Sequence, residues 1–329
     1  MTQPTKGDVH VNKPLTNISI AFMQAASNFV ADTVFPNIPV PMQSDRYYTY
    51  DRGYFNRDEM EERAPGTESA GSGYEVDNTP TYYAKVYAFH HDVPDQVRAN
   101  VDAVIQPDSD AAKLVSHKAL IKREKLWVAK YFQPSLWTFD VDGVAAAPGA
   151  GEVLQWSDAN STPIEDVAAA MDAVLEETGM LPNVLVLGRQ VWTALKNHPD
   201  IIDRVKYGQT APGTAKISLV ALADLFEVER IVVMNAIENT SAEGAANAHS
   251  FIGGKKALLV YSAPSPGLQV PTAGYTFSWT GFLGAGAQGG RIKKFRMEHL
   301  ESDRIEIQMA FDQKLVSADL GYFWDTIVA

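Results

Sequence analysis

The most distinctive short motif in the sequence is rich in glycine and has the spacing of a phosphate-binding turn. Gly284-Ala285-Gly286-Ala287-Gln288-Gly289 matches the dinucleotide-binding pattern. Such a turn binds a pyrophosphate only where it joins a strand to the N-terminus of a helix. Residues 291–297, which follow the motif, have the character of a strand. We therefore do not expect a nucleotide cofactor here.

Two other clusters contain residue types that bind metals. His90-His91-Asp92 is the first, but adjacent side chains on a strand point to opposite faces, so one ion cannot easily bind both histidines. Asp140-Val141-Asp142-Gly143 resembles the start of a calcium loop, yet no glutamate stands at the closing position. We interpret the first cluster as a strand end with structural histidines and the second as a turn.

No local pattern predicts nucleophilic catalysis. The sequence has no Gly-x-Ser-x-Gly elbow, and its seven histidines are scattered. The Gly-Gly-Lys-Lys stretch at 253–256 lacks the spacing and the hydroxyl residue of a P-loop. The chain has no cysteine, which excludes disulfides, thiolate metal sites and cysteine nucleophiles. We expect a protein without catalytic, cofactor-binding or metal-binding residues.

Charged residues gather in two patches of opposite sign. An acidic run lies within the polar, glycine-rich segment 56–80, and lysines recur at i, i+4 and i+7 between 118 and 125. The acidic residues are Asp58, Glu59, Glu61 and Glu62, and the basic residues are Lys118, Lys122 and Lys125, with Arg123 nearby. We expect the two patches to meet across subunits. A solvated helix face and a face that meets DNA phosphates remain open alternatives.

These patches lie on elements that the sequence pattern outlines. Eight of the thirteen tyrosines fall within residues 46–90, so the aromatic flanks of this segment favour two strands around a long tip. Residues 108–132 have the caps and apolar spacing of a long helix. Helix and strand patterns alternate from Thr162 onward, and residues 304–311 alternate as a half-buried strand. A two-stranded hairpin is marginal alone, so we expect this one to pack on its own domain or on a neighbouring subunit.

Composition narrows the possible function classes. The chain has 329 residues, of which 46% are hydrophobic and 21% charged, which is typical of a globular protein with two packed regions. The net charge of −12 makes sequence-specific DNA binding unexpected, because such a chain repels phosphate on average. No apolar run approaches the ~20 residues that a membrane span requires. The polar N-terminus does not have the pattern of a secretory signal.

In order along the chain, the sequence gives an extended arm, a long aromatic hairpin, a long helix, a compact α/β unit and a returning strand. Three stretches mark the returning leg of the hairpin, the long helix and the α/β unit in this order. They are Thr81-Tyr82-Tyr83-Ala84-Lys85-Val86-Tyr87, Ser116-His117-Lys118-Ala119-Leu120-Ile121-Lys122-Arg123-Glu124 and Leu195-Lys196-Asn197-His198-Pro199-Asp200. This order resembles the major capsid proteins of tailed bacteriophages with the Hong Kong 97-type fold, an α+β fold. The resemblance covers nearly the whole chain.

The resemblance implies a division of the chain into five parts. These are an N-terminal arm at 1–45, an extended β-hairpin loop at 46–90, a peripheral domain at 91–161 with its spine helix at 108–132, an α/β axial domain at 162–290, and returning peripheral strands with a C-terminal segment at 291–329. The long peripheral sheet is expected to contain strands near 136–160 and 291–311.

The resemblance also implies a function. We expect a virion protein that self-assembles as hexamers and pentamers into an icosahedral shell around double-stranded DNA, in the cytoplasm of a bacterial host. The expected partners are further copies of the chain, a separate scaffolding protein, a portal and, in some members, a decoration protein. A separate scaffold is expected because no long coiled-coil segment precedes the arm. The tip at 56–80 has no lysine, so it departs from members that crosslink lysine to asparagine there.

Two alternatives remain open. Encapsulin-type nanocompartments share the fold and enclose cargo enzymes, so the material inside the shell distinguishes the two. A cytosolic α/β enzyme with an unusual hairpin is the other, and it would elute as a monomer near 36 kDa with a ligand bound to the 162–262 unit.

Overall fold

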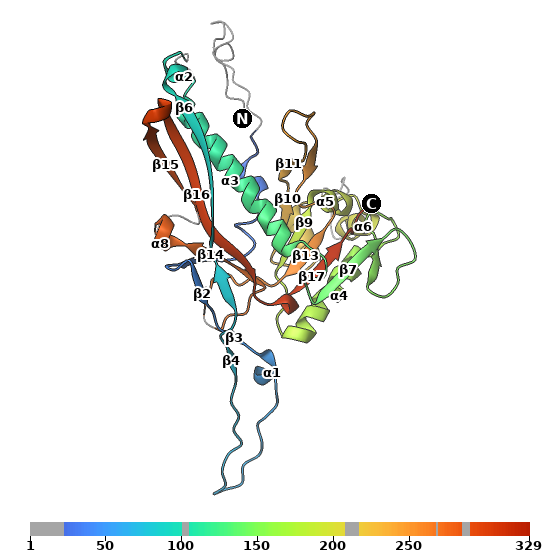
Figure 1. Cartoon of the computed structure of the whole chain (residues 1–329). Helices are drawn as coiled ribbons and strands as arrows, with labels where there is room; N and C mark the ends of the chain where they lie inside the picture. The colour runs from blue at the N-terminus through green and yellow to red at the C-terminus, as the bar shows by residue number, and fades with distance from the viewer. Residues whose placement is uncertain (1–22, 101–104, 208–216, 268, 285–289) are drawn as a thin grey trace.

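The computed structural model describes residues 23–100, 105–207, 217–267, 269–284 and 290–329. Most of the strands fall into two sheets, each covered by helices, and a long narrow loop extends away from both (Figure 1). Part of the expected arm, residues 1–22, and residues 285–289 of the glycine motif lie outside the described residues. The observed combination of helices, one mainly antiparallel sheet and one mixed sheet is the α+β class that the sequence predicts.

The first sheet, here called the peripheral sheet, is built around one long strand. This strand, β16 (Ser302–Leu315), pairs antiparallel with β15 (Gly290–Met297), β14 (Gly274–Trp279) and β6 (Lys85–Pro94), and β1 (Asn37–Val40) adds to β14 in parallel. Successive side chains of β16 point to opposite faces of the sheet, which places Ile305, Ile307 and Met309 on the face that packs against a helix. The strand expected at 304–311 is thus confirmed and extended at both ends.

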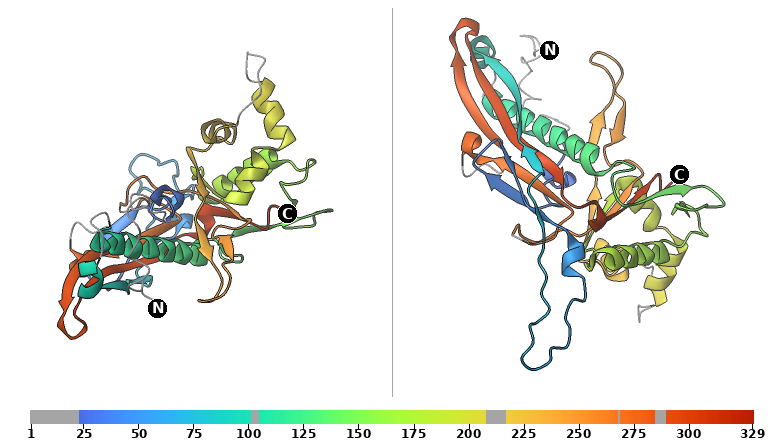
Figure 2. Two further views of the ribbon diagram at one scale, coloured as in Figure 1. Left: turned by 90° about the horizontal axis from the view of Figure 1, so that it is seen from above. Right: turned by 60° about the horizontal axis from the view of Figure 1, so that its bottom comes forward.

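That helix is α3 (Pro107–Tyr131), which lies along β6 and β16 (Figures 1 and 2). Ala111, Val115 and Ala119 are buried against the sheet. Pro107 stands in the first turn, where its missing N–H costs nothing. The helix ends at Tyr131, and the carbonyl oxygen of the next residue, Phe132, accepts a hydrogen bond from Lys256 Nζ at 3.1 Å. The long helix expected at 108–132 is confirmed to within one residue at each end.

Ion pairs join the N-terminal end of α3 to the peripheral sheet. Lys294 Nζ lies 2.6 Å from Asp108 of α3, and Arg296 of β15 contacts Asp95 at 2.5 Å. Asp95 begins the short helix α2 (Asp95–Asn100). Arg98 of α2 contacts Asp303 of β16 at 2.9 Å, so this cluster, which we call the ion clamp, connects both helices to the hairpin of β15 and β16.

The second sheet, here called the axial sheet, has six strands. They lie in the order β10 (Arg230–Met234), β9 (Val184–Gly188), β13 (Ala257–Val260), β17 (Gly321–Asp325), β7 (Phe139–Val144) and β8 (Glu152–Leu154). The helices packed around it are α4 (Pro163–Thr178), α5 (Arg189–Leu195), α6 (Pro199–Tyr207) and α7 (Leu219–Leu225). The central strands β9 and β13 are fully buried, which explains their uninterrupted apolar sequences.

The expectation that strands near 136–160 join the long peripheral sheet is wrong. Strands β7 and β8 lie in the axial sheet, because β17 returns from the end of the chain and pairs in parallel with β7. Asp142-Gly143 is therefore part of a strand instead of a turn. A Cβ at Gly143 would lie 2.5 Å from the carbonyl oxygen of Thr326, so glycine permits the close approach of the C-terminal segment.

The remaining elements are short. They are η1 (Ala26–Asn28), β2 (Ser44–Arg46), β3 (Thr49–Tyr50), α1 (Arg52–Phe55), β4 (Val76–Asp77), β5 (Thr81–Tyr83), β11 (Ile237–Asn239), β12 (His249–Phe251), α8 (Thr280–Leu283), η2 (Glu298–Leu300) and η3 (Ala318–Leu320). Within the described ranges, no helix combines the length and the apolar character needed to cross a bilayer.

Candidate assembly surfaces

The extended loop is attached to its own chain at its root. Strands β2 and β5 pair antiparallel there, and Tyr82 and Tyr47 pack on Phe277 of β14. Tyr82 is 5% exposed and Phe277 is 3% exposed, so this contact belongs to the core of the peripheral domain. The strand expected in the closing flank of the 46–90 segment is confirmed as β5 and β6, but the opening flank, beyond the end of β2 at Arg46, contains only the two-residue strand β3, and Tyr54 and Phe55 lie in the helix α1. The root packs on its own domain.

A second attachment connects the loop to the axial domain. Arg52, at the start of α1, forms ion pairs with Glu177 at the end of α4 and with Asp319 of η3. Asp319 also accepts a hydrogen bond from Thr138. Because both carboxylates belong to the axial side of the molecule, Arg52 fixes the direction in which the loop leaves the body. The sequence gives no signal for this role, because the two acidic partners lie far from Arg52 along the chain.

Beyond Arg52 the loop has a small aromatic cluster of its own. The rings of Tyr50, Phe55 and Tyr74 lie 5.6–6.2 Å apart and hold the two legs of the loop together, beside the two-residue ladder of β3 and β4. Phe55 is 54% exposed and Tyr74 is 56% exposed. Aromatic groups this exposed are favourable contact sites for another protein surface.

The tip beyond this cluster has little contact with its own chain. Residues 61–79 are exposed throughout, and Met60 is 93% exposed. The four acidic residues of the predicted site lie in this tip. Three of them are exposed, and Glu59 is partly buried and forms an ion pair with Arg57, with Nη1 and Oε1 3.8 Å apart. Figure 1 shows the tip pointing away from α3, so the acidic and basic patches do not meet within one chain.

The three lysines of the predicted basic patch are all exposed on α3. Two of them have contacts within the chain: Lys122 lies 5.5 Å from the ring centre of Tyr87, and Lys125 pairs with Glu238 of β11. Neither Lys118 nor Lys122 forms an ion pair among the described residues, so Lys125 is the lysine of the three that does. The sequence identified the position of this face, but not the intramolecular partner of Lys125.

The peripheral sheet leaves one face open. Helix α3 covers the face of β6 and β16 that carries Ile305 and Ile307, and the opposite face of the sheet carries exposed apolar side chains among charged ones. Val86 is 44% exposed and Phe295 is 40% exposed on that face. Together with the loop, this face is an exposed surface on which apolar and charged side chains are mixed.

The metal-binding residue types singled out in the sequence do not come together in the described parts of the chain. His90 and His91 lie in the interior of β6 and not at a strand end as expected. They stand opposite Glu306 and Ile305, so they point to opposite faces as expected for a strand. Among the described residues, no three histidine or acidic side chains are arranged to hold a metal ion. Residues 290–297 form β15, so a strand follows the glycine motif, as the sequence predicts.

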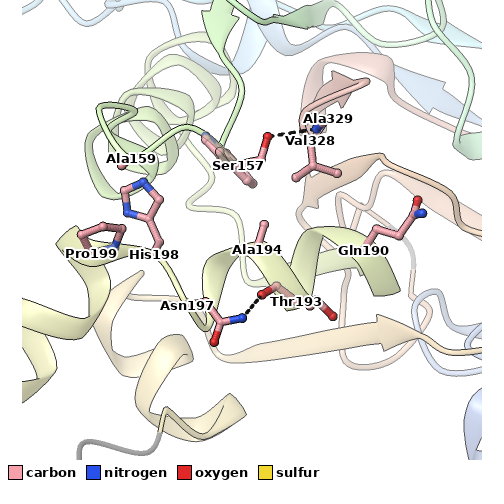
Figure 3. A pocket seen from close by; sticks show the side chains of 11 residues that line it. Ser157, Ala159, Gln190, Thr193, Ala194, Asn197, His198, Pro199, Val328 and Ala329 are labelled. Atoms are coloured by element: carbon pink, nitrogen blue, oxygen red, sulfur yellow. Dashed lines mark hydrogen bonds between the residues drawn. The ribbon is translucent and has the colours of Figure 1, made fainter.

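One cavity of about 440 Å³ opens beside the end of the chain (Figure 3). Its histidine, His198, is engaged in structural hydrogen bonds, since Nε2 lies 3.0 Å from both Ser161 Oγ and the carbonyl oxygen of Asp158. The hydroxyl oxygen of Ser157 accepts a hydrogen bond from the amide of Ala329 at 2.9 Å. The serine and the histidine at this cavity are therefore used to hold loops, and they do not form a nucleophile–base pair.

Comparison with known proteins gives a consistent result. The family model of phage major capsid protein E matches residues 154–271. The major capsid protein of Pseudomonas phage JBD67 is 26% identical over 97% of both chains, and that of Burkholderia phage BcepMu is 22% identical over 95% of both.

Solved structures give the same fold. A phage-related protein from Bordetella bronchiseptica matches 92% of this chain and 93% of its own, with a TM-score of 0.66 and 23% identity. The capsid of cyanophage P-SCSP1u matches 96% of this chain and 93% of its own, with a TM-score of 0.62 and 11% identity. An encapsulin from Synechococcus elongatus matches 95% of this chain and 93% of its own, with a TM-score of 0.56 and 10% identity.

The likeness to two phage capsid proteins over nearly the full chain agrees with the extended loop, the long helix α3 and the two sheets described above. Over nearly its whole length the chain is therefore similar to the major capsid proteins of two phages, and its fold is the Hong Kong 97-type fold.

Proposed function

We propose that this capsid protein assembles as hexamers and pentamers into a closed icosahedral shell that encloses double-stranded phage DNA. The observation that carries the proposal is the extended loop, whose root is packed into the peripheral core while residues 61–79 are exposed throughout. A segment that is firmly attached at one end and unpacked at the other is suited to cover a neighbouring copy.

The geometry of such a contact favours rings and shells over small oligomers. The loop and the surface that receives it are different parts of the same chain, so the contact is heterologous. Heterologous contacts either close into rings or continue from one copy to the next. The role is structural, and we propose no catalytic step for this chain.

We propose further that the acidic tip of one subunit meets the lysine row on α3 of its neighbour. Asp58, Glu59, Glu61 and Glu62 supply one side, and Lys118, Lys122 and Lys125 supply the other. The lysines project from the exposed side of α3, and the tip lies far from them within its own chain (Figure 1). Each exposed pair contributes only ~0.2–1 kcal/mol, but the contact repeats around every capsomer.

The assembly needs partners besides the chain itself. We propose that it forms in the cytoplasm of the bacterial host with a separate scaffolding protein and a portal, and that some shells of this type add a decoration protein. The DNA inside is held without sequence-specific contacts, which agrees with the net charge of −12.

The encapsulin alternative is favoured by one observation, the match to the Synechococcus elongatus shell at a TM-score of 0.56. The two functions differ in what the shell contains. Particles should be purified with scaffold supplied, imaged by negative stain, and analysed for nuclease-protected nucleic acid and for enclosed protein. Closed particles that contain DNA support the proposal, and closed particles that contain an enzyme support the alternative. Sedimentation as a monomer or dimer would contradict both.

A further inference from the structure

A buried carboxyl group joins the spine helix to the segment that precedes β1. Residues 24–35, here called the strap, lie against α3, and Glu124 of α3 is 0% exposed beneath them. The backbone N–H of Val30 donates to both oxygens of Glu124, at 3.0 and 3.2 Å, and the N–H of Ala31 donates at 2.9 Å. The strap therefore covers Glu124 and supplies the hydrogen bonds that its carboxyl group accepts.

The strap is attached to the axial domain as well. The side chain of Gln24 pairs with the backbone of Ile237 through two hydrogen bonds, at 2.7 and 2.8 Å. The carbonyl oxygen of Val34 accepts hydrogen bonds from Ser262 Oγ at 2.6 Å and from Arg230 Nη2 at 3.3 Å. A strap that contacts both α3 and the strands around the axial sheet connects the two domains.

Apolar burial strengthens this connection. Val30, Ala31, Val34 and Phe35 are all at most 3% exposed and belong to the same cluster as Trp127 of α3. That cluster also contains residues of β9, β10 and β13. Releasing the strap would therefore uncover the junction between the spine helix and the axial sheet.

Within the part of the chain that the structure describes, no cation forms an ion pair with Glu124. On the strap, Asp32 lies nearest and pairs with Arg123 at 2.7 Å. On α3, Lys125 pairs with Glu238 of β11, and the ring of His117 contacts Phe29 edge to face at 6.0 Å. Burial is the main cause that raises the pKa of Glu124 to about 7, the N–H groups of Ala31 and Val30 oppose the rise, and Asp32 adds to it.

We propose that the strap is a proton-linked latch between the spine helix and the axial domain. Docking of residues 29–35 removes the carboxyl group of Glu124 from water, so docking takes up a proton. The latch therefore holds most tightly when Glu124 is protonated, and it opens more often as the pH rises through neutrality. The proposal concerns the single chain and does not depend on the shell.

Linkage gives the size of the effect. With a pKa of about 7 when the strap is docked and the ordinary 4.5 when it is open, the docking equilibrium falls about 70-fold between pH 5 and pH 8. Docking of this strap weakens as the pH rises. Docking of a segment that pairs a carboxylate with a cation would instead strengthen as the pH rises, because the cation stabilises the ionised carboxylate. This sign distinguishes the latch from an ordinary salt bridge.

Hydrogen exchange can test the latch directly, because the two amides that bind Glu124 report its opening. Exchange of a peptide covering 29–35 in the full-length chain should be measured at pH 5 and pH 8 and corrected for the intrinsic rate. We expect the protection factors of Val30 and Ala31 to fall by tens of fold, while those of Leu258 and Leu259 in β13 change much less.

The matched variants are Glu124→Gln and Asp32→Asn. Glu124→Gln should remove the pH dependence of strap protection, and Asp32→Asn, which neutralises the neighbouring carboxylate, should retain it. Protection of the wild-type strap that is equal at the two pH values overturns the proposal, even if Glu124→Gln does not fold. A pH dependence that survives in folded Glu124→Gln also overturns it.

Discussion

Tyr82 stacks on Phe277, with ring centres 4.6 Å apart and planes 11° apart. The contact joins the returning leg of the extended loop to a strand of the peripheral sheet that lies almost two hundred residues later in the chain. It fixes the root of the loop before any neighbouring subunit binds. The consequences of this division between a fixed root and an exposed tip can be measured.

The first prediction concerns the root. Phe277→Ala should lower the free energy of unfolding of the unassembled chain by ~3–5 kcal/mol, because it removes a buried ring and leaves a cavity. Tyr83→Ala is the control, since Tyr83 is 53% exposed and its neighbour Tyr82 is buried. It should change stability by no more than ~0.5 kcal/mol in urea titrations. Equal losses for the two variants would mean that the root is not part of the core.

The second prediction concerns the tip. Replacing residues 58–72 with a short glycine–serine linker keeps the Tyr50–Phe55–Tyr74 cluster and removes the exposed end. We expect the thermal unfolding temperature to stay within a few degrees of wild type, because the tip adds little to any core. Closed shells should be lost in electron micrographs. Normal shells from this variant would rule out the tip as an assembly element.

The third prediction is a charge exchange. Changing Asp58, Glu59, Glu61 and Glu62 to lysine should impair assembly at low salt, and adding Lys118→Glu and Lys122→Glu should restore it. Lys125 is left unchanged in both variants, because it already contacts Glu238. Assembly yield is read by sedimentation at two salt concentrations, since added salt screens such contacts. Failure of the second set to rescue the first would show that the patches are not partners.

The fourth prediction concerns acid. The hydrogen bond from Arg296 holds the pKa of Asp95 below its usual range, and that from Lys294 does the same for Asp108. A carboxylate with a lowered pKa stabilises the fold above its ordinary pKa, and the contribution is lost as the pH falls through the folded value. We therefore expect the amides of α2 to lose protection below about pH 4, before those of the axial sheet.

Asp303→Asn offers a matched test of the same clamp. It removes the carboxylate that Arg98 and Lys294 share, while its shape is preserved. Exchange in α2 should then be faster at pH 7 and should depend less on acid. Simultaneous opening of α2 and β13 in wild type would show that the ion clamp is not a separate unit.

Local patterns in the sequence predicted much of this fold. The helix at 107–131 was recognisable because proline, acidic first-turn residues and apolar spacing act within a few residues of one another. The loop was recognisable from its aromatic flanks and polar middle. The pairing of β7 with β17 was not recognisable. Alternation of apolar and polar residues shows which face of a strand is buried, but it does not show which other strand is its partner.

The candidate sites show the same contrast between local patterns, which the sequence reveals, and contacts between distant residues, which it does not. The lysine row was visible as a spacing on one helix. Glu124 was not, because it stands between Arg123 and Lys125 and has the sequence context of a solvated charge. Its burial depends on Val30 and Ala31, which lie more than ninety residues earlier. Arg52 was missed for the same reason, since both of its acidic partners are distant in the chain.

The order of strands in the two sheets also bears on synthesis. Strand β1 pairs with β14, β6 pairs with β16, and β17, made from residues 321–325, lies between β13 and β7 in the middle of the axial sheet. Neither sheet can therefore be completed until almost the whole chain has left the ribosome. Pairings this distant in sequence form slowly. A chain interrupted during translation would have open edges in both sheets and could not take a place in a shell, so competence to assemble arises only in finished molecules.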